Sequence, residues 1–339
     1  MGKNIGLYIL RRIAMLIPQM LAISLTVFLL VRLIPGDPTY VLLGPLVSDE
    51  VREALREEMG FSKPLPVQYV IYLSNLVQGD WGTSITTSQP VLEDLLLRSP
   101  ATLELITFGL LSAVIIGVSI GVLTSLSAGG WLDRFTRVYG LAAGAMPDFW
   151  VALILIFFLN FKLGWFPPPV GRISLLVTAP TRITGFYTVD SLLTGNLEAF
   201  VSSASHLILP VMSLAFVWSG LVIRMTRSAM DEILNSDFIN HARALGLPRN
   251  IIWRYALRNA APPILTMIAI VDGFLLGGAV LIEQVFSWNG VGQYAVRTIG
   301  RADYFAIQGF VLVAAVFTLM IYVVLDVIYA IIDPRITFA

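Results

Sequence analysis

The chain has 339 residues, of which 57% are hydrophobic and only 13% charged, and its mean hydropathy is +0.81. This composition indicates a membrane-embedded chain and excludes a disordered one, which needs low hydrophobicity and high net charge. Lys and Arg together number 22, as do Asp and Glu, so no basic excess indicates nucleic-acid binding. Because cysteine is absent, disulfides and thiolate metal sites are excluded.

Six segments are apolar enough, over about 20 residues, to cross a bilayer as helices. They are residues 13–31, 101–126, 138–161, 205–223, 260–282 and 305–332. The first lacks the small-residue cleavage site of a signal peptide, so we expect it to be retained. The predicted fold is therefore all-α, a polytopic membrane protein with six transmembrane helices.

The basic residues of the loops predict the orientation. Lys3, Arg11 and Arg12 precede the first segment, Arg134 and Arg137 separate the second from the third, and six arginines lie in 224–259. Lys and Arg are enriched in short cytoplasmic loops. Both termini and the loop 224–259 are therefore predicted to be cytoplasmic.

The segment 32–100 is too long to be a simple connection between two membrane helices. We therefore predict that it folds as a small extracytoplasmic helical subdomain. One helix is expected after Ser48, a second near Pro64 or Pro66, and a third after Pro90 that ends before Pro100. This region has nine acidic against five basic residues, an excess that usually indicates only a solvated face but could also seat a partner protein. The chain thus divides into 1–31 (N-terminal segment and first transmembrane helix), 32–100 (the subdomain) and 101–339 (a core domain with five transmembrane helices, which contains the inner loop 224–259).

The outer loop at about 162–204 is rich in Gly, Pro, Ser and Thr and is expected to be irregular. The inner loop 224–259 has a stronger pattern. Asp237 suits the start of a short helix, Gly246 suits its left-handed end, and Pro248 prevents continuation. A second helical stretch follows at 251–260. Two short helices of this kind would form a rigid knob that docks a partner, although a basic loop without a partner fits the pattern equally well.

At this loop the sequence resembles the coupling loop, known as the EAA loop, of permease subunits of ABC importers. The subfamily it resembles is that of the dipeptide, oligopeptide and nickel permeases, specifically the first of their two permease subunits. Further motifs of this subfamily occur in register along nearly the whole chain. They are Arg11-Arg12, Ile34-Pro35-Gly36-Asp37-Pro38, Gly79-Asp80-Trp81-Gly82-Thr83-Ser84, Pro100-Ala101-Thr102-Leu103-Glu104-Leu105, Met146-Pro147-Asp148-Phe149-Trp150, Ile208-Leu209-Pro210, Val285-Phe286-Ser287-Trp288-Asn289-Gly290-Val291-Gly292 and Asp333-Pro334-Arg335.

The resemblance implies the type I ABC importer permease fold and a place in the inner membrane of a bacterial or archaeal cell. It also implies four kinds of partner: a second permease subunit, two cytoplasmic ATPase subunits, an extracytoplasmic solute-binding protein and membrane lipid. ATP and Mg²⁺ would be bound by the ATPases, since this chain has no GxxxxGK[ST] loop. No catalytic, cofactor-binding or metal-binding residue is therefore expected in this chain.

The resemblance assigns ATPase coupling to one group of residues in the inner loop. Where the signature has Glu, Ala and Ala, this chain has Asn240, His241 and Ala242, so any charged contact of that glutamate falls most readily to Arg243. The expected coupling residues are Asp237, Asn240, His241, Ala242, Arg243, Ala244 and Gly246. The substrate class implied is short peptides, with nickel chelates, glutathione-like molecules and oligosaccharides as family alternatives.

Ionisable residues inside membrane segments are costly and therefore indicate function. Glu104, Glu283 and Asp326 lie near segment ends, where a structural role is expected. Asp148 and Asp272 lie ten to twelve residues in, near the midplane. Our hypothesis is that both acids line the translocation path and favour a cationic group, such as a peptide amino terminus. The alternative is that each is protonated or paired within the bundle.

Three GxxxG pairs are expected to be packing seams between helices, namely Gly117/Gly121, Gly140/Gly144 and Gly273/Gly277. The rival function is a secondary transporter driven by an ion gradient, with Asp148 or Asp272 as a proton relay. Against it, no inverted repeat is visible. A membrane-embedded enzyme is disfavoured because the chain has no HExxH or GxSxG motif and only two histidines.

Overall fold

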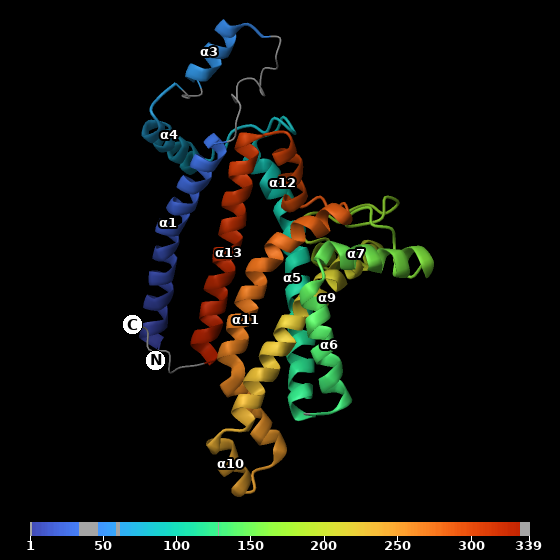
Figure 1. The fold of residues 1–339 in the computed structure, drawn as a ribbon. Helices are drawn as coiled ribbons and strands as arrows, with labels where there is room; N and C mark the ends of the chain where they lie inside the picture. The colour runs from blue at the N-terminus through green and yellow to red at the C-terminus, as the bar shows by residue number, and fades with distance from the viewer. Residues whose placement is uncertain (1, 34–46, 59–61, 128, 333–339) are drawn as a thin grey trace.

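The computed structural model describes residues 2–33, 47–58, 62–127 and 129–332, with the side chains of a few of these left undescribed (Figure 1). These residues are mostly helical and contain no β-strand. The motifs at 34–38 and 333–335, and the side chain of Asp326, lie outside the described part. The elements are α1 (Gly2–Leu33), α3 (Asp49–Glu58), α4 (Leu65–Gln78), α5 (Val91–Leu126), α6 (Trp131–Ala145), α7 (Asp148–Leu155), η1 (Ile156–Lys162), α8 (Tyr187–Leu193), α9 (Leu197–Leu234), α10 (Asp237–Ala244), α11 (Arg249–Val285), α12 (Val291–Gly300) and α13 (Tyr304–Ile332).

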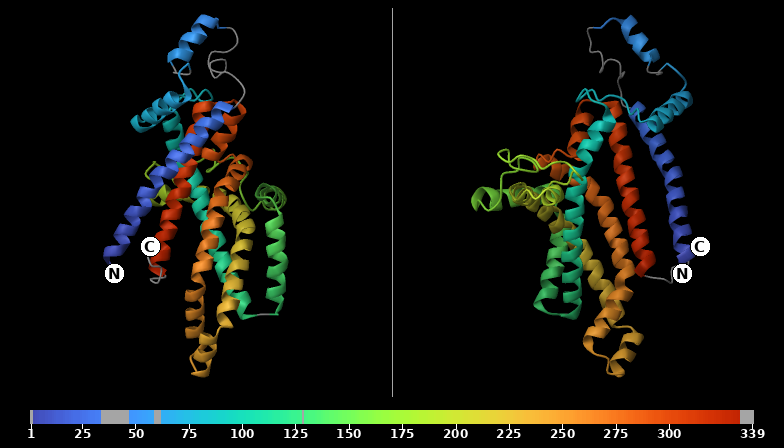
Figure 2. Two further views of the ribbon diagram at one scale, coloured as in Figure 1. Left: turned by 60° about the vertical axis from the view of Figure 1, so that its left-hand side comes forward. Right: turned by 180° about the vertical axis from the view of Figure 1, so that it is seen from behind.

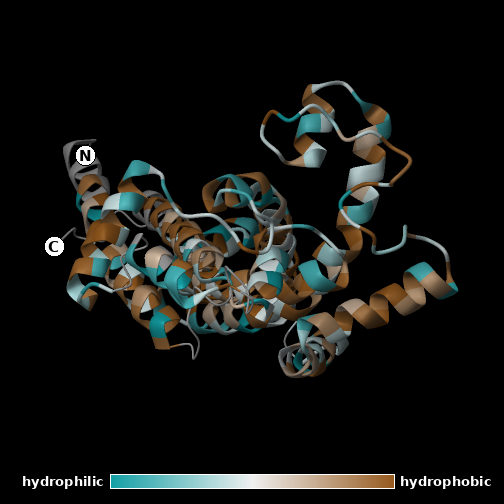
Figure 3. Ribbon diagram, turned by 90° about the horizontal axis from the view of Figure 1, so that it is seen from above, coloured by the Kyte–Doolittle hydropathy of each residue, from teal (hydrophilic) through white to brown (hydrophobic). Residues whose placement is uncertain are grey.

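Five helices of the described part are long and apolar enough to cross a membrane: α1, α5, α9, α11 and α13. The third predicted segment, 138–161, is not one straight helix. It is divided between α6 and the pair α7–η1, which are bent by 108° at residues 146–147. Pro147 has no backbone N–H to continue α6 and stands instead at the start of α7. Seen from above, α7–η1 extends sideways from α6 with a mostly hydrophobic surface (Figure 3).

One predicted helix boundary is wrong, and it lies at a proline. The third subdomain helix does not end before Pro100 but is the first part of α5, which continues through that proline. Pro100 leaves the Leu96 carbonyl without its helical donor, and Arg182 from the outer loop donates to that oxygen at 2.9 Å. The stretch 251–260 continues into the apolar segment 260–282 as predicted, since both lie in α11, which passes through Pro262 and Pro263.

The two ends of the molecule carry different elements. The Gly2 end of α1, the Ile332 end of α13 and the α5–α6 connection lie towards the end occupied by α10, whereas α3, α4 and α12 lie towards the other (Figures 1 and 2). α4 is attached to α1 through Arg32, whose Nε donates to Gln68 at 2.9 Å, and through Phe28, whose ring meets that of Tyr69 edge-on. The order of the elements thus places α3 and α4 at the opposite end from the inner loop, as the sequence predicted.

The centre of the bundle is formed by α5, α9 and α11, which share one hydrophobic core. The first two predicted glycine seams both pack against α9. Gly117 and Gly121 face Val222 and Thr226, and Gly140 and Gly144 face the stem of Arg224. The third seam is different, because nothing lies within 4 Å of a Cβ placed at Gly277.

The seam between α5 and α9 makes a testable prediction. A Cβ at Gly117 would overlap the Val222 side chain, so Gly117→Val is expected to destabilise the protein by about 2 kcal/mol through overpacking. The measurement is the thermal unfolding midpoint of the purified protein in detergent. Gly277→Ala is the control and should leave the midpoint unchanged; equal midpoints for both variants would contradict a tight α5–α9 seam.

Candidate coupling loop and translocation path

The short helix α10 forms the tip of the molecule beyond α9 and α11 (Figure 1). Its last turn closes where Gly246 N–H donates to the Arg243 carbonyl at 3.0 Å and Leu247 N–H donates to the Ala242 carbonyl at 3.2 Å. Gly246 has φ +76°, a left-handed conformation that a side chain disfavours. Pro248 then starts α11. The helix predicted at 237–246, and its stop, are confirmed.

One face of α10 is fixed to the rest of the bundle. Ile239 is fully buried in a hydrophobic cluster with Met230 and Leu234 of α9 and with Ile252 and Ala256 of α11, and Ala242, one turn further along, is buried as well. A displacement of α10 would therefore move both long helices with it, because packed side chains transmit rather than absorb such a shift.

The expected coupling residues fall on two different faces. Asp237, Asn240, His241, Arg243, Ala244 and Gly246 are exposed, whereas Ala242 is buried. Arg243 Nη1 donates to Asn240 Oδ1 at 3.2 Å, so the two polar side chains are held side by side on the outer surface. Ala242 is therefore not available for direct contact with a partner.

Three apolar side chains near α10 were not singled out from the sequence. Phe238 is 47% exposed, Leu245 69% and Leu247 36%. Large apolar groups on a helix whose inner face is already filled indicate a surface that another protein covers. Their spacing in the sequence could have identified them, because none of the three lies on the helix face that carries Ile239 and Ala242.

The structure places Asp148 at a corner where three elements meet. It is the first residue of α7, and its Oδ2 accepts a hydrogen bond from Trp218 Nε1 of α9 at 3.3 Å. Trp218 stacks on Phe274 of α11, with ring centroids 5.7 Å apart. The carboxylate also lies over Gly278, where a side chain would collide with it. Because Asp148 is only half-buried and Phe274 is exposed, this corner offers a carboxylate beside open aromatic faces.

Asp272 is not brought to this corner. It is buried, with 1% of its surface exposed, and neither carboxylate oxygen has a hydrogen-bond partner among the described residues. On α11 it shares a face with the buried Ile268 and Leu275, roughly opposite the face of Phe274 and Gly278. Of the two acids predicted to line the path, only Asp148 therefore lies beside exposed surface.

The acids near the ends of the membrane segments are held by protein groups, as a structural role requires. Glu104 forms an ion pair with Arg172 of the outer loop at 2.6 Å and accepts from Thr188 N–H at 2.9 Å and Thr188 Oγ1 at 2.7 Å. Glu283 is fully buried and accepts from Thr102 Oγ1 of α5 and from the backbone N–H of Gln293 at 2.8 Å. These contacts tie the outer loop and α12 to the core helices.

Asp190 organises the outer loop from within. Burial alone would raise its pKa, but Thr184 Oγ1 donates to the carboxylate at 2.7 Å, and the backbone N–H groups of Ile183, Thr184 and Gly185 donate at 3.1, 2.8 and 2.8 Å. These hydrogen bonds outweigh burial and hold the pKa of Asp190 below its usual value. The loop predicted to be irregular at about 162–204 is irregular between η1 and α8, whereas its last part is helical because α9 begins at Leu197.

The fold and the loop define a class, a polytopic helical membrane protein with a short, firmly packed helix at one end. The family described as "Binding-protein-dependent transport system inner membrane component" matches residues 113–338, and its N-terminal companion, "Binding-prot-dependent transport system membrane comp, N-term", matches residues 6–106. The chain belongs to this permease family, as the motifs predicted, and has the type I permease fold.

Individual relatives agree with the family. The "Probable D,D-dipeptide transport system permease protein DdpB" of Escherichia coli strain K12 is 43% identical over 91% of this chain and 91% of its own length. The "Di/tripeptide transport system permease protein DppB" of Pseudomonas aeruginosa strain UCBPP-PA14 is 40% identical over 97% of this chain and 98% of its own. The "Dipeptide transport system permease protein DppB" of Escherichia coli strain K12 is 36% identical over the same shares. None of this supports a transporter driven by an ion gradient.

Proposed function

We propose that this chain is a transmembrane permease subunit of an ATP-driven importer of short peptides. Its partners would be a second permease subunit, two ATPase subunits and an extracytoplasmic binding protein, in the inner membrane of a bacterial or archaeal cell. The observation that carries the proposal is α10, which exposes Phe238, Leu245 and Arg243 while Ile239 fixes it to α9 and α11. The names of the relatives support peptides as the substrate class.

In the proposed orientation, α10 and the ends of α1 and α13 near it are cytoplasmic, and α3, α4 and α12 face outward. The ATPase subunits bind ATP with Mg²⁺ and hydrolyse it, so this chain needs no cofactor and no enzymatic activity of its own. Closure of the ATPases on ATP would displace α10, and its packing against α9 and α11 would convert this displacement into a change of access across the membrane.

The proposal is tested by crosslinking and transport in the assembled complex. Cysteine at the exposed position Ala244 should crosslink to cysteines on an ATPase subunit, whereas cysteine at the buried Ala242 should react far less. Uptake of labelled dipeptides into proteoliposomes should require ATP and the binding protein. If no crosslink forms at position 244 in any nucleotide state, or uptake follows an ion gradient without ATP, the proposal is wrong.

We also propose that Asp148 and Asp272 favour a cationic group of the cargo. The Asp148 corner supports this directly, since a carboxylate beside the faces of Trp218 and Phe274 suits a protonated amino terminus. For Asp272, a role requires that a neighbouring helix move away from α11 during transport, because its carboxylate is buried in this conformation.

Removing each charge separately tests these roles. Asp148→Asn is expected to slow uptake of peptides with a free amino terminus about tenfold, while N-acetylated peptides that the binding protein delivers are affected much less. Asp272→Asn should produce a similar selective loss if this carboxylate meets cargo in the rearranged state. Initial uptake rates in proteoliposomes provide the measurement. If wild-type and variant proteins take up cationic cargo at equal rates, the corresponding residue does not interact with cargo in the translocation path.

A further inference from the structure

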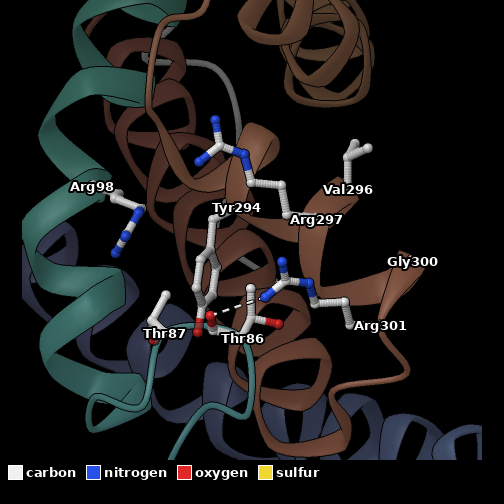
Figure 4. A pocket seen from close by; sticks show the side chains of 8 residues that line it. All are labelled: Thr86, Thr87, Arg98, Tyr294, Val296, Arg297, Gly300 and Arg301. Carbon is white, nitrogen blue, oxygen red and sulfur yellow. Dashed lines mark hydrogen bonds between the residues drawn. The ribbon is translucent and has the colours of Figure 1, made fainter.

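A cavity of about 450 Å³ opens near the end of the molecule that carries α12, opposite α10. Its walls come from the first part of α5, from the segment before it, from α12 and from the residue that follows α12. Three arginines line it: Arg98 on α5, Arg297 on α12 and Arg301 directly after α12 (Figure 4). No acidic side chain is part of this lining.

The three guanidinium groups differ in how far the protein already satisfies them. Arg98 is paired with Asp94 and lies over the ring of Tyr294, 4.9 Å from its centroid. Arg301 Nη1 donates to the Thr86 carbonyl at 3.2 Å. Arg297 is exposed and forms no ion pair or hydrogen bond with any described residue. The cavity therefore has positive charge that the chain itself leaves uncompensated.

The cavity is held in shape by buried contacts behind it. Asp303 is fully buried and accepts hydrogen bonds from Ser84 Oγ at 2.6 Å and Thr86 N–H at 3.0 Å, which joins the segment before α5 to the segment after α12. Tyr294 forms the floor, with only 3% of its surface exposed, and its burial raises the pKa of its hydroxyl to about 12. The arginines thus surround a preformed space with an un-ionised phenol at its base.

These features fit a carboxylate from another protein better than a phospholipid headgroup. Arginine forks match carboxylates with paired hydrogen bonds, and Thr86 and Thr87 line the same space. Val296 is the one large aliphatic side chain in the lining, so the cavity offers little apolar surface for an acyl chain. The other charge at this end of the molecule is of opposite sign, since α3 begins with Asp49 and Glu50 and the sequence of the subdomain is acidic overall.

We infer that this arginine pocket receives an acidic side chain of the extracytoplasmic binding protein. This inference rests on the proposed function, because it requires that α12 face outward. In the docked complex Arg297 binds the incoming carboxylate, with Arg301 and Arg98 on either side. The basic pocket and the acidic subdomain together fix the orientation of the binding protein on the permease.

The test is the dependence of ATPase activity on the concentration of binding protein, measured with the complete complex in nanodiscs. Arg297→Gln should raise the concentration for half-maximal stimulation severalfold, and Arg297→Gln with Arg301→Gln about tenfold, without changing the maximal rate. The stimulation should also depend less steeply on salt concentration. Arg297→Lys should restore most of the affinity because it keeps the charge.

Lys63→Gln is the matched control, since it removes one exposed positive charge at the start of α4, away from the pocket. An unchanged half-maximal concentration in the double variant, or an equal rise in the Lys63 variant, would overturn the inference. So would a defect that follows lipid composition in the absence of binding protein. Failure of the proposed function is distinguishable, because the wild-type complex itself would then bind the binding protein without ATP-dependent uptake.

Discussion

Phe238→Asp is expected to reduce ATP-driven uptake at least tenfold while the chain stays in the membrane in normal amount. Phe238 is 47% exposed on the outer face of α10, and burying such a ring against a partner is worth about 1.5–3 kcal/mol. A carboxylate in its place would have to be dehydrated on docking, which adds to the loss. Leu245→Asp, at a position 69% exposed, should have the same effect for the same reason.

Two measurements separate lost docking from lost folding. Retention of the ATPase subunits during affinity purification of the permease reports docking, and uptake of labelled dipeptide into proteoliposomes reports coupling. Tyr255→Asp is the control, since Tyr255 is 49% exposed on α11 but outside α10. If the Tyr255 variant loses the ATPases as readily, or the Phe238 variant keeps both ATPases and transport, α10 is not the docking element.

The part of this loop that the sequence could predict depends on local chemistry. Asp237, Gly246 and Pro248 lie within twelve residues of one another. The start and the end of the helix follow from the backbone conformation and hydrogen bonding at these positions alone. Which face of α10 is buried depends on Met230 and Ile252, which are supplied by two other helices. For this reason Ala242, though part of the motif, could not be assigned to the inner face from the motif.

The errors at prolines have a common physical origin. Pro100 and Pro147 look alike in sequence, since each lacks an N–H and lies in or directly beside a long apolar segment. At Pro100 the helix continues, and Arg182, 82 positions further along the chain, binds the carbonyl that the proline leaves free. At Pro147 the chain turns by 108° instead. Hydropathy reports how apolar a segment is and carries no information about such remote donors.

The surroundings of the buried acids could also be predicted only in part from the sequence. Glu104 and Asp272 are equally buried, but only Glu104 has an arginine and a threonine against it. Position along a membrane segment predicted the structural role of Glu104, because end positions can be reached by loops such as the one that carries Arg172. It could not reveal that Asp272 faces the core, since two faces of a uniformly apolar helix look the same in sequence.

Glu104→Ala is expected to destabilise the protein by about 3–5 kcal/mol, the cost of leaving one buried charge without its partner. The Arg172 side chain is only 10% exposed and its guanidinium stacks 3.8 Å from the centroid of Tyr187, so it cannot turn to water without breaking that packing. Thr188 N–H and Oγ1 would lose their acceptor at the same time. The thermal unfolding midpoint of the detergent-purified protein should fall by about 10 °C.

A double variant distinguishes the cost of leaving a buried charge unpaired from the cost of losing a contact. Glu104→Ala with Arg172→Met removes both charges, so it should be more stable than Glu104→Ala alone even though it lacks more polar groups. Arg182→Ala is the control within the same loop: that arginine is exposed, its one hydrogen bond to a described residue goes to the Leu96 carbonyl, and its loss should cost about 1 kcal/mol. If the double variant is less stable than Glu104→Ala, then Arg172 stabilises the outer loop without Glu104, through the ring of Tyr187 and the Gly185 carbonyl, and the unpaired charge is not the main cost of Glu104→Ala.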